Sequence, residues 1–322
     1  MAEALKVIAA ARQRESPLAA APRTRHRASP AGWLFTAPVI AGWLVFVAVP
    51  VLATLLLSFT DYVVGGAPTL VGLRNYRDLF TSTDPSFFDS VRATALYAFL
   101  SVPVCLLASF GLASLLNLQI RFRAFFRAAL FLPVVIPLAA SSVIWMWLFQ
   151  PDFGLVNVVS RALGLGSPAW LASETTVIPT MVLMNVWLTG NSTLIFLAAL
   201  QNVPRHLYEA VEVDGGNAWH KLRHVTLPMV SPTLFFNAIT GFITALQAFV
   251  QPAIMTSDAY HQGGPNNASL LYVLFIYREA FRFSRLGSAS AAAVLLFAVI
   301  AALTWAFFKL SRSLIYYEGE RA

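Results

Sequence analysis

Charged residues are scarce in this chain of 322 residues, where they make up 11% of the sequence against 58% hydrophobic residues. A typical soluble domain is about a quarter charged, so a soluble globular fold is excluded because it could not cover so much apolar surface. Asp, Glu, Lys, Arg and His are absent from six long runs, at 33–60, 93–120, 128–151, 175–204, 225–257 and 286–308. A membrane-spanning helix needs about 20 such residues, whereas a membrane barrel would show short alternating segments. We therefore predict six transmembrane helices.

Catalytic groups are also missing at membrane depth. The five histidines lie outside the six runs, so Ser192 of the Gly190–Thr193 stretch has no histidine to activate it as a nucleophile. The runs hold no aspartate pair, and the chain lacks both a zinc-binding His-Glu-x-x-His helix and a Gly-x-x-x-x-Gly-Lys-Ser/Thr phosphate loop. The single cysteine, Cys105, cannot form an internal disulfide. We predict that the chain is not an enzyme and holds no metal or cofactor of its own.

The 22 Lys and Arg residues are distributed unevenly between the loops. Fifteen of them fall on the side that holds both termini, within 1–31, 121–127, 205–223 and the segment after 308. The positive-inside rule then predicts that both termini are cytoplasmic. Anionic lipid explains the formal charge of +7 without a nucleic-acid partner. The apolar stretch 268–277 is too short to span the membrane and predicts an interfacial helix.

The loop between the fourth and fifth predicted spans carries the most specific pattern in the chain. Residues 204–213 can form a short helix, which Gly215 and Gly216 end. Asn217 is a good N-cap for a second short helix over 218–224, and Pro228 follows where the chain returns to the membrane. These features predict a compact helix-turn-helix elbow that projects from the bilayer.

This elbow resembles the EAA loop of permease subunits of ATP-binding-cassette (ABC) importers. That pattern is Glu-Ala-Ala, three residues, Gly, nine residues, then Ile-x-Leu-Pro, and the chain has Glu209-Ala210-Val211, Gly215 and Val225-Thr226-Leu227-Pro228 at the same spacing. Val211, Val225 and Gly216 depart from the usual Ala, Ile and Ala. The resemblance implies that the loop is the coupling helix, which sits in a cleft of an ATPase subunit. It also implies the coupling residues, namely Glu209, Ala210, Asp214, Gly215, Leu227 and Pro228.

Other stretches resemble the branch of this family that serves maltose, glycerol-3-phosphate and related solutes, namely 123–133, 145–154, 263–267 and 277–281. The resemblance implies an all-α polytopic membrane protein with the type I ABC importer permease fold, in a prokaryotic cytoplasmic membrane. It implies four kinds of partner: a second homologous permease chain, two ATPase subunits that bind ATP and Mg, an extracytoplasmic solute-binding protein and lipid. The expected organisation is a permease domain at 32–315, with a coupling loop at 205–228 and tails at 1–31 and 316–322.

Two polar stripes are candidates for the solute pathway. In the fifth span, polar residues recur every three or four positions and so share one helix face, at Asn237, Thr240, Thr244, Gln247 and Gln251. The fourth span repeats the arrangement at Asn185, Thr189 and Ser192, beside Trp187. Such stripes can hydrogen-bond a solute or hold membrane helices together. The resemblance favours the first interpretation, with Asn185, Trp187, Thr189, Thr244, Gln247 and Gln251 as pathway residues.

Two other functions stay open on these grounds. A secondary carrier would use only an ion gradient, although the spans lack the acidic residues that many such carriers use. A non-transporting membrane scaffold is the second alternative. For an importer, the candidate solutes are disaccharides, oligosaccharides, polyols and glycerol phosphates, and the absence of charge in the spans argues against an anionic solute.

Overall fold

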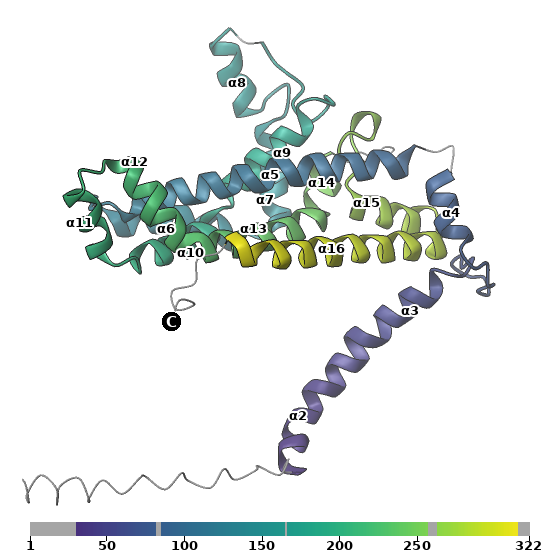
Figure 1. Ribbon diagram of the computed structural model, residues 1–322. Coiled ribbons are helices and arrows are strands. Elements are labelled where there is room, and N and C mark those ends of the chain that lie inside the picture. Colours follow the sequence, from purple (N-terminus) through teal and green to yellow (C-terminus); the bar gives the residue numbers. More distant parts are fainter. Residues whose placement is uncertain (1–29, 82–84, 165, 257–262, 315–322) are drawn as a thin grey trace, which may run out of the picture. The chain divides into compact units, whose positions relative to one another are not determined.

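The computed structural model describes residues 30–81, 85–164, 166–256 and 263–314, and within them the regular structure is helical (Figure 1). The predicted tails lie outside these residues, apart from residues 30 and 31. The chain forms two compact units, Met1–Ala53 and Thr54–Ala322. Helix α2 (Pro30–Trp43), one turn of π-helix (Leu44–Ala48) and α3 (Val49–Leu57) follow one another in sequence. They include a 25-residue apolar helix, Trp33–Leu57, which confirms the first predicted span.

Three further helices of the second unit are long enough to cross a bilayer without a sharp bend. They are α5 (Ser86–Asn117), the helix over Ala218–Leu246 that contains α13 (Leu227–Leu246), and α16 (Leu286–Leu314). Helix α5 packs against α13 as well as α9 (Val177–Trp187) and α10 (Gly190–Gln201), so it forms the centre of this unit (Figure 1). These helices correspond to the second, fifth and sixth predicted spans.

The third and fourth predicted spans are each broken into two helices. Helix α6 (Arg123–Val135) and α7 (Leu138–Leu148) meet at a bend of 99°, and α9 and α10 meet at 51°. Pro137 explains the first break, because proline disfavours helical geometry in the residue before it and Ile136 is extended there. With each bent pair taken as one span, the six predicted spans all have helical counterparts.

The fifth predicted span is also interrupted, which corrects the expectation of one continuous polar stripe. Helix α13 ends at Leu246, and α14 (Val250–Met255) begins after a short break. Gln247 lies at the C-cap of α13, so Gln251 belongs to a different helix from Thr244. The fourth-span stripe crosses a break as well, because Asn185 lies in α9 and Ser192 in α10. Sequence spacing alone therefore does not place these side chains on one face.

The predicted interfacial helix over 268–277 is instead a buried element. Helix α15 (Tyr272–Tyr277) continues into a π-helical turn (Arg278–Arg282) and packs against α5 and α16. Leu270, Leu271 and Leu274 are at most 1% exposed. The backbone N–H of Tyr272 donates to Thr94 Oγ1 of α5 (2.7 Å), and its hydroxyl donates to the Ala292 carbonyl of α16 (3.1 Å). The residues of α15 are apolar on every side of the helix, so the helix packs inside the protein instead of lying with one apolar face against the membrane surface.

Helix α8 (Leu155–Ala162; Figure 1) was not anticipated from the sequence. It buries polar side chains and exposes apolar ones. Asn157 is fully buried, where its amide donates to the carbonyls of Gln150 and Pro168 and accepts from the indole of Trp170. Leu155, by contrast, is 62% exposed, and Val158 and Val159 are also exposed. An apolar exterior over a polar interior is typical of a helix that faces something other than water.

Candidate functional site

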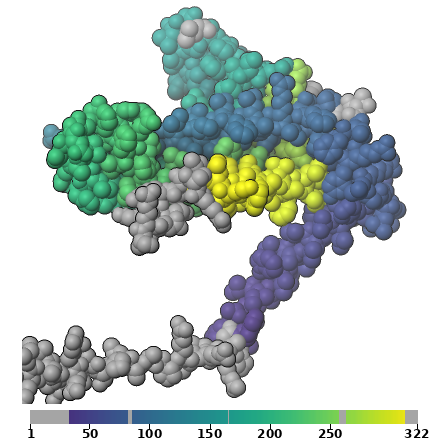
Figure 2. Space-filling view, in the orientation of Figure 1, coloured from purple at the N-terminus to yellow at the C-terminus, as the bar shows by residue number. Residues whose placement is uncertain are grey.

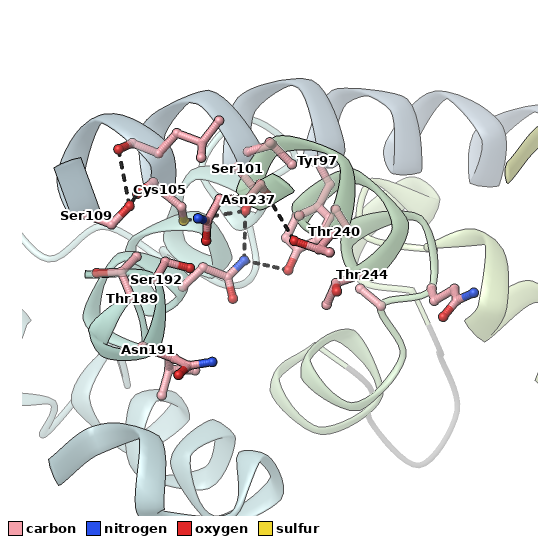
Figure 3. A pocket seen from close by; sticks show the side chains of 18 of the residues that line it. Tyr97, Ser101, Cys105, Ser109, Thr189, Asn191, Ser192, Asn237, Thr240 and Thr244 are labelled. Atoms are coloured by element: carbon pink, nitrogen blue, oxygen red, sulfur yellow. Dashed lines mark hydrogen bonds between the residues drawn. The ribbon is translucent and has the colours of Figure 1, made fainter. Parts of the chain in front are cut away.

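A cavity of about 730 Å³ lined by both polar and apolar side chains lies between α5, α9, α10, α13 and α14 (Figure 3). Its walls bring together both predicted stripes despite the helix breaks, namely Asn185, Thr189, Ser192, Asn237, Thr240, Thr244, Gln247 and Gln251. None of the described residues that line it is Asp, Glu, Lys, Arg or His. A wall of hydroxyl and amide groups interspersed with aliphatic and Phe side chains suits a ligand that is hydroxylated and uncharged.

Three cavity side chains from three helices form a closed ring of hydrogen bonds. Tyr97 of α5 donates its hydroxyl proton to Gln251 Oε1 of α14 (2.5 Å). Gln251 Nε2 donates to Asn185 Oδ1 of α9 (2.5 Å), and Asn185 Nδ2 donates back to the Tyr97 hydroxyl (2.6 Å). Asn185 Nδ2 also donates to Ser101 Oγ (2.9 Å). Both N–H groups of the Asn185 amide are therefore used. The ring links α5, α9 and α14 because each helix contributes one of its three side chains.

Tyr97 and Ser101 were missed by the sequence reasoning. Both line the cavity, and Tyr97 is only 2% exposed. They stand four residues apart in the second predicted span, so they share a helix face. That spacing is the signal that could have found them. It was weak because one tyrosine and one serine do not make a stripe.

Other polar side chains of the cavity remain available for a ligand. Thr244, Gln247, Asn191 and Ser192 make no side-chain hydrogen bond with any residue that the structure describes, and Thr244 and Gln247 are exposed at the cavity. The hydroxyl of Thr189, the N-cap residue of α10, in contrast donates to the Val186 carbonyl of α9 (2.7 Å). The predicted set is thus divided between side chains with free hydrogen-bonding groups and side chains already paired within the protein.

Trp187 is the one predicted pathway residue that does not line the cavity. Its ring instead lies 6.0 Å from that of Trp145 in α7. Trp187 follows Asn185 by two positions in α9 and therefore lies on a different face of that helix, so the structure does not bring it together with the other pathway residues.

The predicted elbow is formed by α11 (Arg205–Val213) and α12 (Ala218–Lys221), which make a lobe at one end of the second unit (green in Figure 2). A turn of π-helix (Leu222–Thr226) joins α12 to α13 in one helix from Ala218 to Leu246. Asn217 caps α12 as predicted, because its Oδ1 accepts from the backbone N–H groups of Trp219 (3.0 Å) and His220 (3.1 Å). The elbow is therefore continuous with a helix that lines the cavity.

Gly215 ends α11 in a conformation that favours glycine. Its φ is +76°, a left-handed value that side chains disfavour. Its N–H donates to the Glu212 carbonyl (3.0 Å), and the N–H of Gly216 donates to the Val211 carbonyl (2.8 Å). These two bonds form a Schellman motif, which satisfies the last carbonyls of the helix. The sharp turn between α11 and α12 depends on this arrangement.

The predicted coupling residues occupy two surroundings in the elbow. Glu209, Ala210, Asp214 and Gly215 are exposed. Leu227 and Pro228 are half-buried in the first turn of α13, beside Val225, which is 7% exposed and packs in the core with residues of α5 and α10. The Tyr208 hydroxyl lies 3.1 Å from Thr226 Oγ1 and ties α11 to the π-helical turn. The elbow thus has an exposed outer surface and a base anchored in the core.

Residues 106–315 match the family described as "Binding-protein-dependent transport system inner membrane component". The chain belongs to this family. The probable ABC transporter permease protein YesP of Bacillus subtilis (strain 168) is 34% identical over 292 residues, covering 90% of this chain and 93% of the relative. The lactose transport system permease protein LacF of Rhizobium radiobacter is 34% identical over 261 residues, covering 78% and 84%. The arabinooligosaccharides transport system permease protein AraP of Bacillus subtilis (strain 168) is 31% identical over 293 residues, covering 90% of each chain.

A solved structure of similar fold belongs to a bacterial ABC transporter involved in the import of the acidic polysaccharide alginate. It superposes with a TM-score of 0.77 at 21% identity, covering 89% of this chain and 98% of that one. The alginate transporter in complex with its alginate pentasaccharide-bound periplasmic protein gives 0.75 at 22% identity, covering 88% and 96%. The predicted fold, an all-α importer permease, is confirmed, and this permease is a multi-pass component of the inner membrane.

Two departures of this permease from the EAA pattern compensate for each other in space. Val211 is larger than the usual Ala and Gly216 is smaller. A Cβ added to Gly216 would lie 2.4 Å from Val211 Cγ1 and 2.9 Å from the Val211 carbonyl oxygen, distances that require a shift. Because Gly216 has no Cβ, the larger side chain of Val211 fits against the turn.

We expect Gly216→Ala to loosen the elbow, because overpacking of this kind costs about 1–3 kcal/mol. The thermal midpoint of the purified transporter and its ATPase stimulation should both fall. Adding Val211→Ala should restore part of both, because it removes the contact with Val211 Cγ1 and leaves the one with the Val211 carbonyl oxygen. Gly111→Ala in α5 is the matched control, because a Cβ there meets nothing within 4 Å. Equal defects in the single and double variants would show that the two positions are independent.

Proposed function

We propose that this permease forms half of the translocation pathway of an ATP-driven, binding-protein-dependent importer of an uncharged saccharide or a related polyhydroxylated solute. The observation that carries the proposal is the cavity, which offers hydroxyl and amide groups and no Asp, Glu, Lys, Arg or His among its described lining residues. The names of the lactose and arabinooligosaccharide relatives agree with such a solute. A carboxylate-rich solute such as alginate would find no cation in this wall to pair with.

The proposed partners follow from what this chain leaves incomplete. Thr240, Thr244 and Gln247 are exposed at the cavity, and a second, homologous permease chain would close that side. The sequence lacks a phosphate loop, so two partner ATPase subunits would bind ATP and Mg and receive the elbow. A solute-binding protein would deliver the solute from outside. The excess of basic residues on the side of the elbow supports cytoplasmic termini.

In the proposed cycle, ATP-driven closure of the ATPases moves the elbow, and the helix from Ala218 to Leu246 carries this motion to the cavity. Thr244 and Gln247 are the proposed solute contacts because their polar groups are free of side-chain partners among the described residues. Asn185 and Gln251 shape the cavity wall through their ring with Tyr97. Trp187 is no longer assigned to the pathway.

Cys105 provides a direct test, because the only cysteine of the chain lines the cavity. We expect a maleimide to label this subunit in the assembled transporter. Solute-loaded binding protein should slow the labelling, whereas solute-free binding protein should not, because only bound solute fills the cavity. Cys105→Ser is the control for labelling elsewhere in this chain. An unchanged labelling rate with solute at every stage of the ATP cycle would place the solute pathway elsewhere.

The alternative of a secondary carrier is separated by a second measurement. Vesicles that hold the complete transporter but no internal nucleotide should show no uptake. Uptake driven by an ion gradient under these conditions would support the carrier and reject the importer.

A further inference from the structure

The turn between α5 and α6 gathers positive charge that no acidic side chain balances among the residues that the structure describes. Arg121, Arg123 and Arg127 lie within seven residues and form no ion pair with any described residue. Arg205 and Arg223 of the elbow are likewise without an acidic partner in the described part of the chain. We call the first three residues the arginine cluster.

Neutral groups hold two members of the arginine cluster, Arg123 and Arg127, in place. Arg123 Nε donates to the Leu116 carbonyl at the end of α5 (2.6 Å). With its amide oriented to satisfy both guanidinium groups, Gln201 accepts from Arg123 Nη2 (3.1 Å) and Arg127 Nη2 (2.9 Å). Arg127 Nε is buried and has no hydrogen-bond partner among the described residues. The guanidinium groups of Arg123 and Arg127 are thus fixed in position, and neither has an acidic partner in the described part of the chain.

The beginning of α6 adds to this positive potential. The N-cap of α6 is Phe122, whose side chain makes no hydrogen bond to the N–H groups of the first turn. The first turn of α6 also contains no acidic residue. The positive end of the helix dipole therefore lies beside the arginines. Phe122 has a φ of +61°. Phe122 and Phe125 are 76% and 68% exposed. Exposed aromatic rings alternating with arginines are typical of a segment at a membrane interface.

We propose that the arginine cluster binds the anionic headgroup of a membrane phospholipid. The guanidinium groups and the first turn of α6 would hold the phosphate, and the exposed phenylalanine rings would lie against the acyl chains. The rings favour a lipid over a free phosphate ion, which would leave them in water. The inference rests on the proposed function for one point, the placement of this turn in the cytoplasmic leaflet.

The contacts of the cluster also connect the lipid to the elbow. Gln201 is the last residue of α10, and α11 begins at Arg205. A bound headgroup would reduce the repulsion between Arg123 and Arg127, which share the Gln201 oxygen. The lipid would therefore stabilise the junction through which the elbow is attached to α10.

The test uses the complete transporter, purified from nanodiscs of phosphatidylcholine with or without phosphatidylglycerol, and measures retained lipid by native mass spectrometry. We expect wild type to retain phosphatidylglycerol in preference to phosphatidylcholine. Arg121→Gln with Arg127→Gln should weaken retention by more than about tenfold, because each arginine near an anionic surface contributes about fivefold. Arg77→Gln with Arg92→Gln is the matched control, since it removes the same charge outside the cluster and should retain the lipid.

Three results would overturn the proposal: equal retention of the two lipids by wild type, equal retention by the cluster variant and wild type, or complete displacement of the lipid by millimolar inorganic phosphate. If the cluster variant does not assemble, the comparison of the two lipids on wild type decides alone. Lipid retention is measured without transport. Failure of saccharide uptake with preserved retention would therefore reject the proposed function and leave this inference standing.

Discussion

Gly215→Pro is expected to abolish ATP-driven uptake while leaving the chain inserted in the membrane. Proline fixes φ near about −65°, whereas Gly215 adopts +76°, and its missing N–H removes the bond to the Glu212 carbonyl. Proline also disfavours helical geometry at the preceding residue, Asp214. The last turn of α11 must then open, and the elbow loses the shape that we propose an ATPase subunit recognises. Uptake by reconstituted vesicles, together with the amount of chain in the membrane, measures the effect.

Gly164→Pro is a closely matched control for this experiment. Gly164 has a φ of +74° and donates its N–H to the Arg161 carbonyl (3.0 Å), so the backbone defect is the same but lies after α8. We expect it to retain uptake. Gly215→Asn should also retain most activity, because Asn tolerates left-handed geometry. Normal uptake by Gly215→Pro would show that the turn is not part of the coupling path.

The second large effect is expected from Asn185→Ala. This change removes three hydrogen bonds at once, to Tyr97, Ser101 and Gln251, and leaves buried polar atoms without partners. Unsatisfied groups of this kind cost about 1–3 kcal/mol each, so we expect a loss of about 2–4 kcal/mol in stability. The purified transporter should unfold at a clearly lower temperature, and uptake should fall because α5, α9 and α14 are no longer held together.

Thr244→Val separates this structural role from solute binding. Thr244 lines the same cavity but makes no side-chain hydrogen bond with a described residue, so its loss should weaken solute transport without lowering the unfolding temperature. Combining Asn185→Ala with Tyr97→Phe should cost less than the sum of the two single changes, because both break the same ring. Strict additivity would contradict a shared network.

The elbow could be predicted in detail from the sequence because its determinants are local. A glycine that tolerates positive φ, an asparagine that caps the next helix and a proline in the first turn of α13 act within a few residues of one another. The Val211–Gly216 compensation was not foreseen, since the two substitutions look independent until the Schellman turn brings them into contact. The same reasoning found the six spans, because crossing a bilayer requires uncharged runs of sufficient length.

The cavity required the folded chain. The partners in the Tyr97, Asn185 and Gln251 ring are separated by 66 to 154 residues, and no periodic pattern relates such distant positions. The break after Leu246 also redirects the side chains that follow it, and Gln251 of the next helix lies in the cavity wall.

By itself, the amino-acid sequence determined that this protein crosses a membrane, which segments do so, and where the chain bends into an elbow, because transfer into hydrocarbon and backbone geometry depend on residues close together in the chain. Only the tertiary structure decided which polar groups are paired and which remain free for a solute. Hydrogen bonding inside a membrane protein depends on distances between helices, and those distances are set by packing across the whole chain.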